Sequence, residues 1–200
     1  MIISLHYPKT AGTSFRKTLI DVYGENLRIH HKQKYLKNKE FYIENNIKIV
    51  HGHFKISDYK EMFPDADVMV WLRDPAARVL SYYNYCKYVR EAPFSSNFRI
   101  RHPNFINFIN SNRMDILSND YNNYIGDYSY KDFSFIGITE RYSSDMQRLS
   151  KLLKWNHFKI YHINKTKNNE NVKITNEMRQ IIYSRLSKEY ELYRHSICIQ

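Results

Sequence analysis

The sequence is poor in the residues that mark several classes of protein. It has five glycines and five prolines among 200 residues, and it shows no low-complexity tract and no repeat of fixed period. These features argue against a fibrous, solenoid or largely disordered chain. No apolar run approaches the roughly 18 to 20 residues that span a bilayer, and the first residues lack the basic region and cleavage site of a signal peptide. We therefore expect a cytoplasmic protein without an integral membrane segment.

Cysteine is scarce as well, because only Cys86 and Cys198 are present. They do not have the spacing of metal ligands, and Cys86 lies among residues with a helical pattern. A disulfide framework is therefore not expected. The sequence also has no convincing cluster of carboxylate, cysteine and histidine ligands, so we expect no metal.

What the chain does contain fits one globular domain over residues 1–200. Its hydrophobic content of 42%, with 16% aromatics, can fill a sizeable core. The formal net charge is +11, which favours anionic partners such as nucleotides, acidic polysaccharides or nucleic acids. A solvated lysine-rich surface explains the same excess, so charge alone does not select a partner.

Strand and helix patterns alternate along the chain. The apolar runs MIISLHY, IKIVHGH, ADVMVWLRDP, FSFIGIT and HFKIYHIN predict strands. Helical spacing follows the first, third and fourth runs, and TNEMRQIIYSRLSKEYELYRH predicts a terminal helix. In the first helix, Thr13 or Ser14 is a candidate N-cap and Gly24 a candidate C-terminal end. The alternation predicts an α/β fold: a parallel sheet like that of P-loop proteins, with helices on both faces and active loops at the carboxyl ends of the strands.

The turn PKTAGTS lies at the start of the first helix, directly after the first strand. Backbone amides and the helix dipole favour an anion at this position, Lys9 adds a charge, and Thr10, Thr13 and Ser14 add hydroxyl donors. The turn suits a phosphate or sulfate group, although an ordinary strand-to-helix turn has the same pattern. It is not a nucleoside-triphosphate loop, because Lys9 precedes Gly12 instead of following it.

A second candidate anion site is the segment VMVWLRDPAARVLSYY. Arg73 stands at the end of a buried strand, and Ser81 lies in the helix that follows. The two side chains could bind a second phosphate. The alternative is structural, with Arg73 paired to Asp74 and Ser81 enclosed within its helix.

In this order, HYPKTAGTS and RDPAARVLSYY resemble the 5′-phosphosulfate loop and the 3′-phosphate site of sulfotransferases that use 3′-phosphoadenosine-5′-phosphosulfate (PAPS). The form is most similar to carbohydrate sulfotransferases, in particular the group of heparan sulfate 2-O-sulfotransferase and its bacterial relatives. IVHGHF resembles the segment with that group's catalytic histidine, FIGITERY a later strand and turn, and HINKTK the loop that closes over the nucleotide. These segments keep the family order across about residues 2–170.

The resemblance implies a role for individual residues. The 5′-phosphosulfate would be held by the first turn, comprising Lys9, Thr10, Ala11, Gly12, Thr13 and Ser14. Arg73 and Ser81 would bind the 3′-phosphate, and Lys165 and Thr166 would belong to the nucleotide gate. His53 is the expected general base, with His51 beside it.

Sulfuryl transfer to a hydroxyl needs a base, which supports a histidine here independently. An imidazole with a pKa near 6.5 can remove the hydroxyl proton near neutral pH. His51 and His53 flank Gly52 at strand spacing, so both rings can share one side of the chain. One can act as the base and the other as its hydrogen-bonded support. Lys9 would stabilise the negative charge that develops on the departing phosphate.

Two other functions remain open at this stage. A phosphotransferase could use Asp74 as a magnesium ligand, and a non-enzymatic protein could bind nucleic acid or another polyanion through its positive charge. We favour a sulfotransferase that acts on a hydroxyl acceptor. We expect this acceptor to be a saccharide or polysaccharide, which can itself be anionic, and we expect no nucleic acid partner. A homodimer could complete the acceptor cleft of so short a chain.

Overall fold

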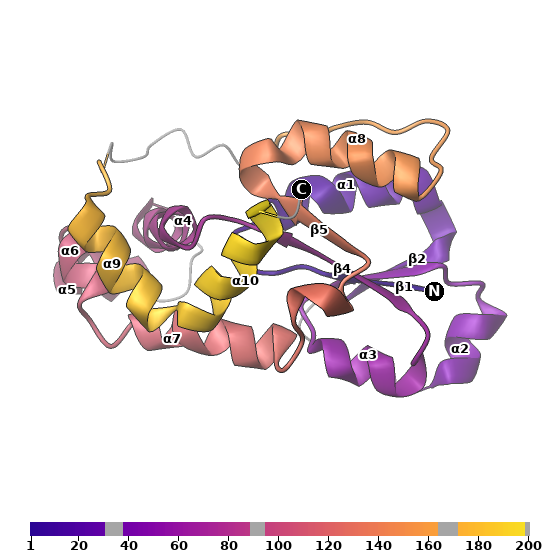
Figure 1. Cartoon of the computed structure of the whole chain (residues 1–200), viewed down its shortest axis with the longest axis horizontal. Helices are drawn as coiled ribbons and strands as arrows, with labels where there is room; N and C mark the ends of the chain where they lie inside the picture. The colour runs from indigo at the N-terminus through magenta and orange to yellow at the C-terminus, as the bar shows by residue number, and fades with distance from the viewer. Residues whose placement is uncertain (31–37, 89–94, 164–171, 199–200) are drawn as a thin grey trace.

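A parallel β-sheet forms the centre of the molecule (Figure 1). The structure is a computed structural model, and it describes residues 1–30, 38–88, 95–163 and 172–198. Within these residues the sheet has five strands, in the order β2 (Leu27–His30), β3 (Ile49–Gly52), β1 (Ile2–Leu5), β4 (Asp67–Leu72) and β5 (Phe135–Ile138). Every neighbouring pair is parallel. The predicted α/β class is therefore confirmed.

Helices cover both faces of the sheet. In Figure 1, α1 (Gly12–Tyr23) and α8 (Tyr142–Leu152) lie on one face, and α2 (Lys39–Glu44) and α3 (Ile56–Met62) lie on the other. Phe15 and Met146 pack on Trp71 from the first side, and Tyr59 packs from the second side into the cluster that contains Val70. Helices therefore cover the buried strand β4 on both of its faces, which explains its continuous apolar sequence.

A helical layer with its own core lies beside the sheet. It consists of α4 (Pro75–Tyr88), α5 (Ser95–Arg101), α6 (Phe105–Ile109), α7 (Met114–Asp120) and α9 (Asn176–Arg185). The last helix, α10 (Ser187–Cys198), returns to the sheet, where Leu192 joins the core. Short helical turns complete the chain: η1 (Gly24–Asn26), the π-helix η2 (Tyr121–Ile125), η3 (Tyr130–Asp132) and η4 (Thr139–Arg141).

The register of the sheet brings three strand ends together. Leu5 at the end of β1 is level with Gly52 of β3 and with Val70 of β4, and the His6 amide donates to the Gly52 carbonyl at 2.8 Å. From β1 the chain goes to β2 on one side of the sheet, whereas from β4 it goes to β5 on the other. Ligands of open α/β sheets bind at such a reversal of strand order.

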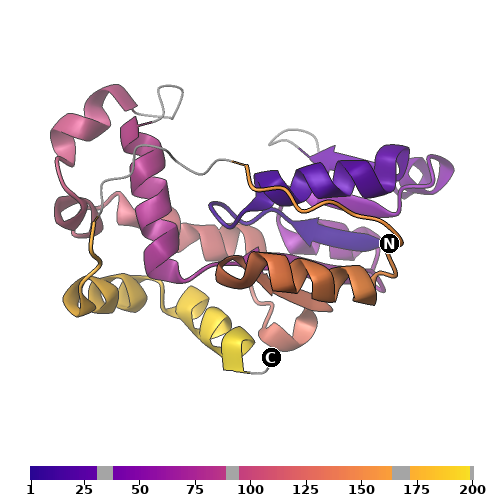
Figure 2. The ribbon, with the colours of Figure 1, turned by 90° about the horizontal axis from the view of Figure 1, so that it is seen from above.

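The prediction of a strand at HFKIYHIN is wrong. Residues 157–163 form no strand and instead run along α1 (Figure 2). Hydroxyl groups of α1 fix them: Thr18 donates to the Lys159 carbonyl at 2.6 Å, and the Ser14 hydroxyl accepts from the Ile163 amide at 2.9 Å. The helix α1 begins at Gly12, so Thr13 and Ser14 lie inside its first turn. The N-cap is Ala11 without a side-chain hydrogen bond, so the predicted Thr13 or Ser14 cap is also wrong.

Other boundaries differ in smaller ways. The edge strand β2 was not predicted. Residues 95–125 contain α5, α6, α7 and η2. The terminal helix is divided at Leu186, whose backbone is not helical. Thr175 caps α9 through the Met178 amide, at the predicted start of that helix, and Gly24 ends α1 as predicted.

Candidate active site

The loop His6–Ala11 joins β1 to α1 and has a strained backbone. Lys9 and Ala11 have positive φ angles of 68° and 65°, and Thr10 between them does not. Such conformations cost roughly 1–3 kcal/mol each in non-glycine residues and cluster at ligand sites. The alternation is typical of a nest, in which successive amides face an anion. The first turn of α1 behind it has neither a side-chain cap nor an acidic residue, so its dipole favours the same ligand.

Gly12 is required by the close approach of His6. A Cβ atom at position 12 would lie 1.9 Å from Cδ2 of the His6 ring, which is far inside van der Waals contact. The imidazole of His6 thus lies directly against the first residue of α1. This contact links the start of the helix to the histidines described below.

Lys9 brings a half-buried positive charge into the loop. Burial, with a smaller contribution from the nearby Arg73 guanidinium, lowers the pKa of Lys9 from 10.5 to about 8, although Cys86 acts in the opposite direction. The ammonium lies 4.2 Å from the centre of the Tyr85 ring. Within the described part of the chain, no carboxylate is within ion-pair distance of Lys9. The charge is therefore available to an anionic ligand.

Arg73 is the second cation at this edge of the sheet. Its Nε atom lies 3.9 Å from Oε1 of Glu140, a long ion pair, and its side chain is half-buried. Burial lowers the pKa of Arg73, while Glu140 and Asp74 act to raise it. The sequence did not identify Glu140 as its partner, because residue 140 reaches Arg73 only through the pairing of β4 with β5.

The carboxylate of Asp74 is already engaged. It accepts hydrogen bonds from the Ala77 amide at 2.8 Å, from Arg179 Nη1 at 3.1 Å and from the Tyr183 hydroxyl at 2.7 Å. These contacts fix the start of α4 and tie it to α9. They leave this carboxylate poorly suited to the magnesium-ligand role that the phosphotransferase alternative requires.

The predicted histidines lie at the end of β3 and have different environments. His51 is fully buried; its Nδ1 lies 2.8 Å from Ser4 Oγ, and burial lowers its pKa to about 3. His53 is half-buried, and its ring stacks on His6 with centroids 4.2 Å apart. His6 also stacks on His51 at 5.2 Å, so both predicted histidines lie on one side of the chain, as their spacing indicates. The centre of the Tyr124 ring, in η2, lies 6.0 Å from the centre of the His53 ring.

The predicted hydroxyl donors divide into two groups. The buried Thr10 donates to the Tyr7 carbonyl at 2.7 Å, and Ser14 holds Ile163, so both have structural partners. Thr13 and Ser81 are half-buried, the former in the first turn of α1 and the latter in α4. The predicted gate residues Lys165 and Thr166 lie outside the described residues.

Beneath the loop, Arg78 forms a buried ion-pair network. Its side chain is inaccessible to solvent and donates to both carboxylate oxygens of Glu189 at 2.6 Å and to Asp120 at 2.9 Å. Tyr7 donates to Glu189 at 2.8 Å and lies with its ring 4.8 Å from the guanidinium. The network connects the anion loop to α4, α7 and α10. The sequence placed Arg78 in a helix but gave no sign of this burial.

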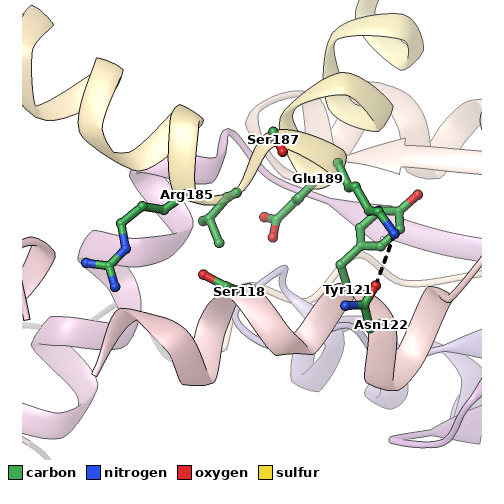
Figure 3. Close-up of a pocket in the computed structure, with 8 residues that line it drawn as sticks. Ser118, Tyr121, Asn122, Arg185, Ser187 and Glu189 are labelled. Atoms are coloured by element: carbon green, nitrogen blue, oxygen red, sulfur yellow. Dashed lines mark hydrogen bonds between the residues drawn. The ribbon is translucent and has the colours of Figure 1, made fainter. Parts of the chain in front are cut away.

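A hollow of about 190 Å³ lies between α7 with η2 and the junction of α9 with α10 (Figure 3). The charged side chains in its wall are already paired: Arg185 with Asp115, Glu189 with Arg78, and Lys188 with the Asn122 side chain. No predicted site residue among the described positions lines it.

The described residues contain neither a metal-binding cluster nor a membrane-spanning helix. No group of three or more histidine, cysteine, aspartate or glutamate side chains could hold a metal ion. None of the described helices combines the length and apolarity needed to cross a bilayer.

Comparison with known proteins shows a likeness among solved structures but none among family models or curated proteins. No model of a known protein family matches the chain, and no curated protein matches it. Among solved structures, the chain is similar to the crystal structure of a sulfotransferase from Alicyclobacillus acidocaldarius, with 11% sequence identity and a TM-score of 0.47. That match covers 98% of this chain and 95% of the other. A functional assignment therefore depends on the residues of the site itself.

Proposed function

We propose that this protein is a sulfotransferase that moves a sulfuryl group from PAPS to a hydroxyl acceptor. The observation that carries the proposal is the half-buried Lys9 ammonium, held in a strained loop beside Arg73 with no carboxylate at ion-pair distance among the described residues. Arg73 has only the long ion pair with Glu140, so an anion that bound both cations would be stabilised by each of them. Perturbed groups of this kind cluster at functional sites.

The described residues fit a donor that carries two phosphate positions. Lys9 and the amides from Ala11 to Ser14 would hold the 5′-phosphosulfate at the start of α1. Arg73 and Ser81, which belong to the end of β4 and to α4, would hold the 3′-phosphate. Thr10 and Ser14 would act mainly by fixing the loop and residues 159–163, because their hydroxyls have partners in the chain.

His53 is the base that we propose. PAPS supplies a sulfuryl group with a phosphate as leaving group, and the transfer needs the acceptor proton to be removed. His53 would accept that proton as the acceptor oxygen bonds to sulfur, and Lys9 would stabilise the charge left on the phosphate oxygen. His51 is buried and neutral, so we propose that it supports the end of β3 through Ser4.

The acceptor that we propose is a saccharide or polysaccharide, which can be anionic. Support comes from the resemblance of HYPKTAGTS, IVHGHF and RDPAARVLSYY to carbohydrate sulfotransferases and from the net charge of +11. A positively charged protein attracts acidic chains over a distance of about a Debye length, so transfer to such an acceptor should weaken with added salt.

Calorimetric titration with adenosine 3′,5′-bisphosphate, in the absence of metal, tests the donor site. We expect clear binding, with ATP much weaker. Lys9→Ala and Arg73→Ala should each weaken binding by about 10- to 100-fold, since a hydrogen bond to a charged group contributes roughly 1.5–3 kcal/mol. Lys17→Ala is the matched control, because Lys17 is exposed on the same helix as the loop's amides. A preference for magnesium and ATP, or equal affinity in all variants, would contradict the proposal.

A further inference from the structure

Tyr85 lies where it can hold Lys9. The centre of its ring is 4.2 Å from Lys9 Nζ, within the range of a cation–π interaction. Tyr85 follows Ser81 by one turn of α4, and residues four apart lie on one helix face. The contact with Lys9 therefore indicates that the face carrying Ser81 is turned toward the anion loop.

The kind of partner matters because the half-buried Lys9 lies near another cation, Arg73. The groups that act on its charge are Arg73 from the end of β4 and Cys86 from α4. A carboxylate in the place of Tyr85 would hold the ammonium but would neutralise it and repel an anionic ligand. An aromatic ring has a negative face without net charge. It can therefore hold the ammonium and leave its positive charge available.

We propose that Tyr85 is a positioning residue of the anion site, whose ring keeps the Lys9 ammonium charged and in place for a phosphate group. The inference rests on the proposed donor site and adds to it a residue that neither motif identified. Tyr85 need not touch the donor, because it acts through Lys9. Its hydroxyl has no part in this role, so phenylalanine should replace it.

The first test is the affinity for adenosine 3′,5′-bisphosphate at about pH 7, compared among the wild-type protein, Tyr85→Phe and Tyr85→Leu. We expect Tyr85→Leu to bind about 5- to 30-fold more weakly, which corresponds to a partly desolvated cation–π interaction, and Tyr85→Phe to stay within about twofold. Tyr88→Leu is the control, because that ring of α4 lies near Lys87 instead of Lys9. Unchanged or tighter binding by Tyr85→Leu would overturn the proposal.

The second test needs no ligand. The pKa of the Lys9 ammonium, followed by NMR of labelled lysine, should fall below about 8 in Tyr85→Leu and stay unchanged in Tyr85→Phe. A purely structural role would lower the melting temperature without moving this titration. If the wild-type protein does not bind the bisphosphate, the donor site fails, whereas an unmoved Lys9 titration in Tyr85→Leu refutes the role of Tyr85 separately.

Discussion

At the scale of single residues, the His6 ring leaves no room for a side chain at position 12. Gly12→Ala should destabilise the protein by about 1–3 kcal/mol, the usual cost of overpacking, because the new methyl group would meet the His6 ring at 1.9 Å. Urea unfolding measures this loss. The double variant His6→Ala/Gly12→Ala should recover part of it relative to the sum of the single changes. Strict additivity of the two changes would show that the ring and position 12 do not meet.

His51 should make the stability of the protein depend on pH below neutrality. Its folded pKa of about 3 lies below the ordinary value of 6.5, so only the unfolded chain takes up this proton between those values. The free energy of unfolding should therefore decrease as the pH is lowered below 6.5, by up to about 1.4 kcal/mol per pH unit for this group. Between about pH 6.5 and 5, the dependence of the free energy of unfolding on pH should be weaker in His51→Gln than in the wild-type protein. It should not change in His157→Gln, which alters an exposed histidine; equal slopes in both variants would argue against a buried neutral His51.

At the scale of elements, α1 uses one polar stripe to hold residues 159–163. Ser14, Thr18 and Asp21 bond to Ile163, Lys159 and Tyr161 respectively. The variant Ser14→Ala/Thr18→Val should lower the free energy of local opening by about 1 kcal/mol for each lost bond. Hydrogen exchange at the Ile163 amide should then become faster, whereas Ile20→Ala, an exposed change on α1, should leave it unaltered. Unchanged exchange would mean that the stripe does not hold this segment.

The same scale shows what the sequence can predict and what it cannot. The sequence runs that form β1, β3, β4 and β5 are apolar because helices cover both faces of the sheet. Strands of this kind can be predicted from the local sequence alone. β2 is a short edge strand with Arg28 and His30, which weakens its pattern. Apolar and polar residues alternate in residues 157–163 as they do in a strand. This segment instead bonds to hydroxyl groups of α1, which the local sequence does not indicate.

For the site, the sequence predicted Lys9, Arg73 and His53 at strand ends, and all three lie at the carboxyl edge of the sheet. That part is predictable because parallel strands place their ends at one edge. The partners of these residues cannot be predicted in this way. Tyr85 reaches Lys9, and Glu140 reaches Arg73, only after α4 and β5 have packed.

At the scale of the whole molecule, Arg78 joins the sheet, the helical layer and the last helix. It binds Glu189 of α10 and Asp120 of α7 without solvent access, and Glu189 also accepts from Tyr7 beside the loop. Loss of one partner from a buried ion pair leaves the other charges uncompensated and costs about 3–5 kcal/mol. We therefore expect Arg78→Met to lower the free energy of unfolding by about that amount.

The loss should extend beyond α4, because the network includes elements that are distant in the sequence. In Arg78→Met, amide exchange should rise both in α10 and in the loop that contains Tyr7, and bisphosphate affinity should fall although Arg78 contacts no proposed ligand position. Arg194→Met is the matched control: Arg194 is exposed on α10, so its loss should change stability by no more than about 0.5 kcal/mol. If Arg78→Met loosened α10 but left the loop's exchange and the bisphosphate affinity intact, the network would stabilise the helices without supporting the site. Faster exchange in both places would instead show that the docking of α10 and the shape of the anion loop depend on one another.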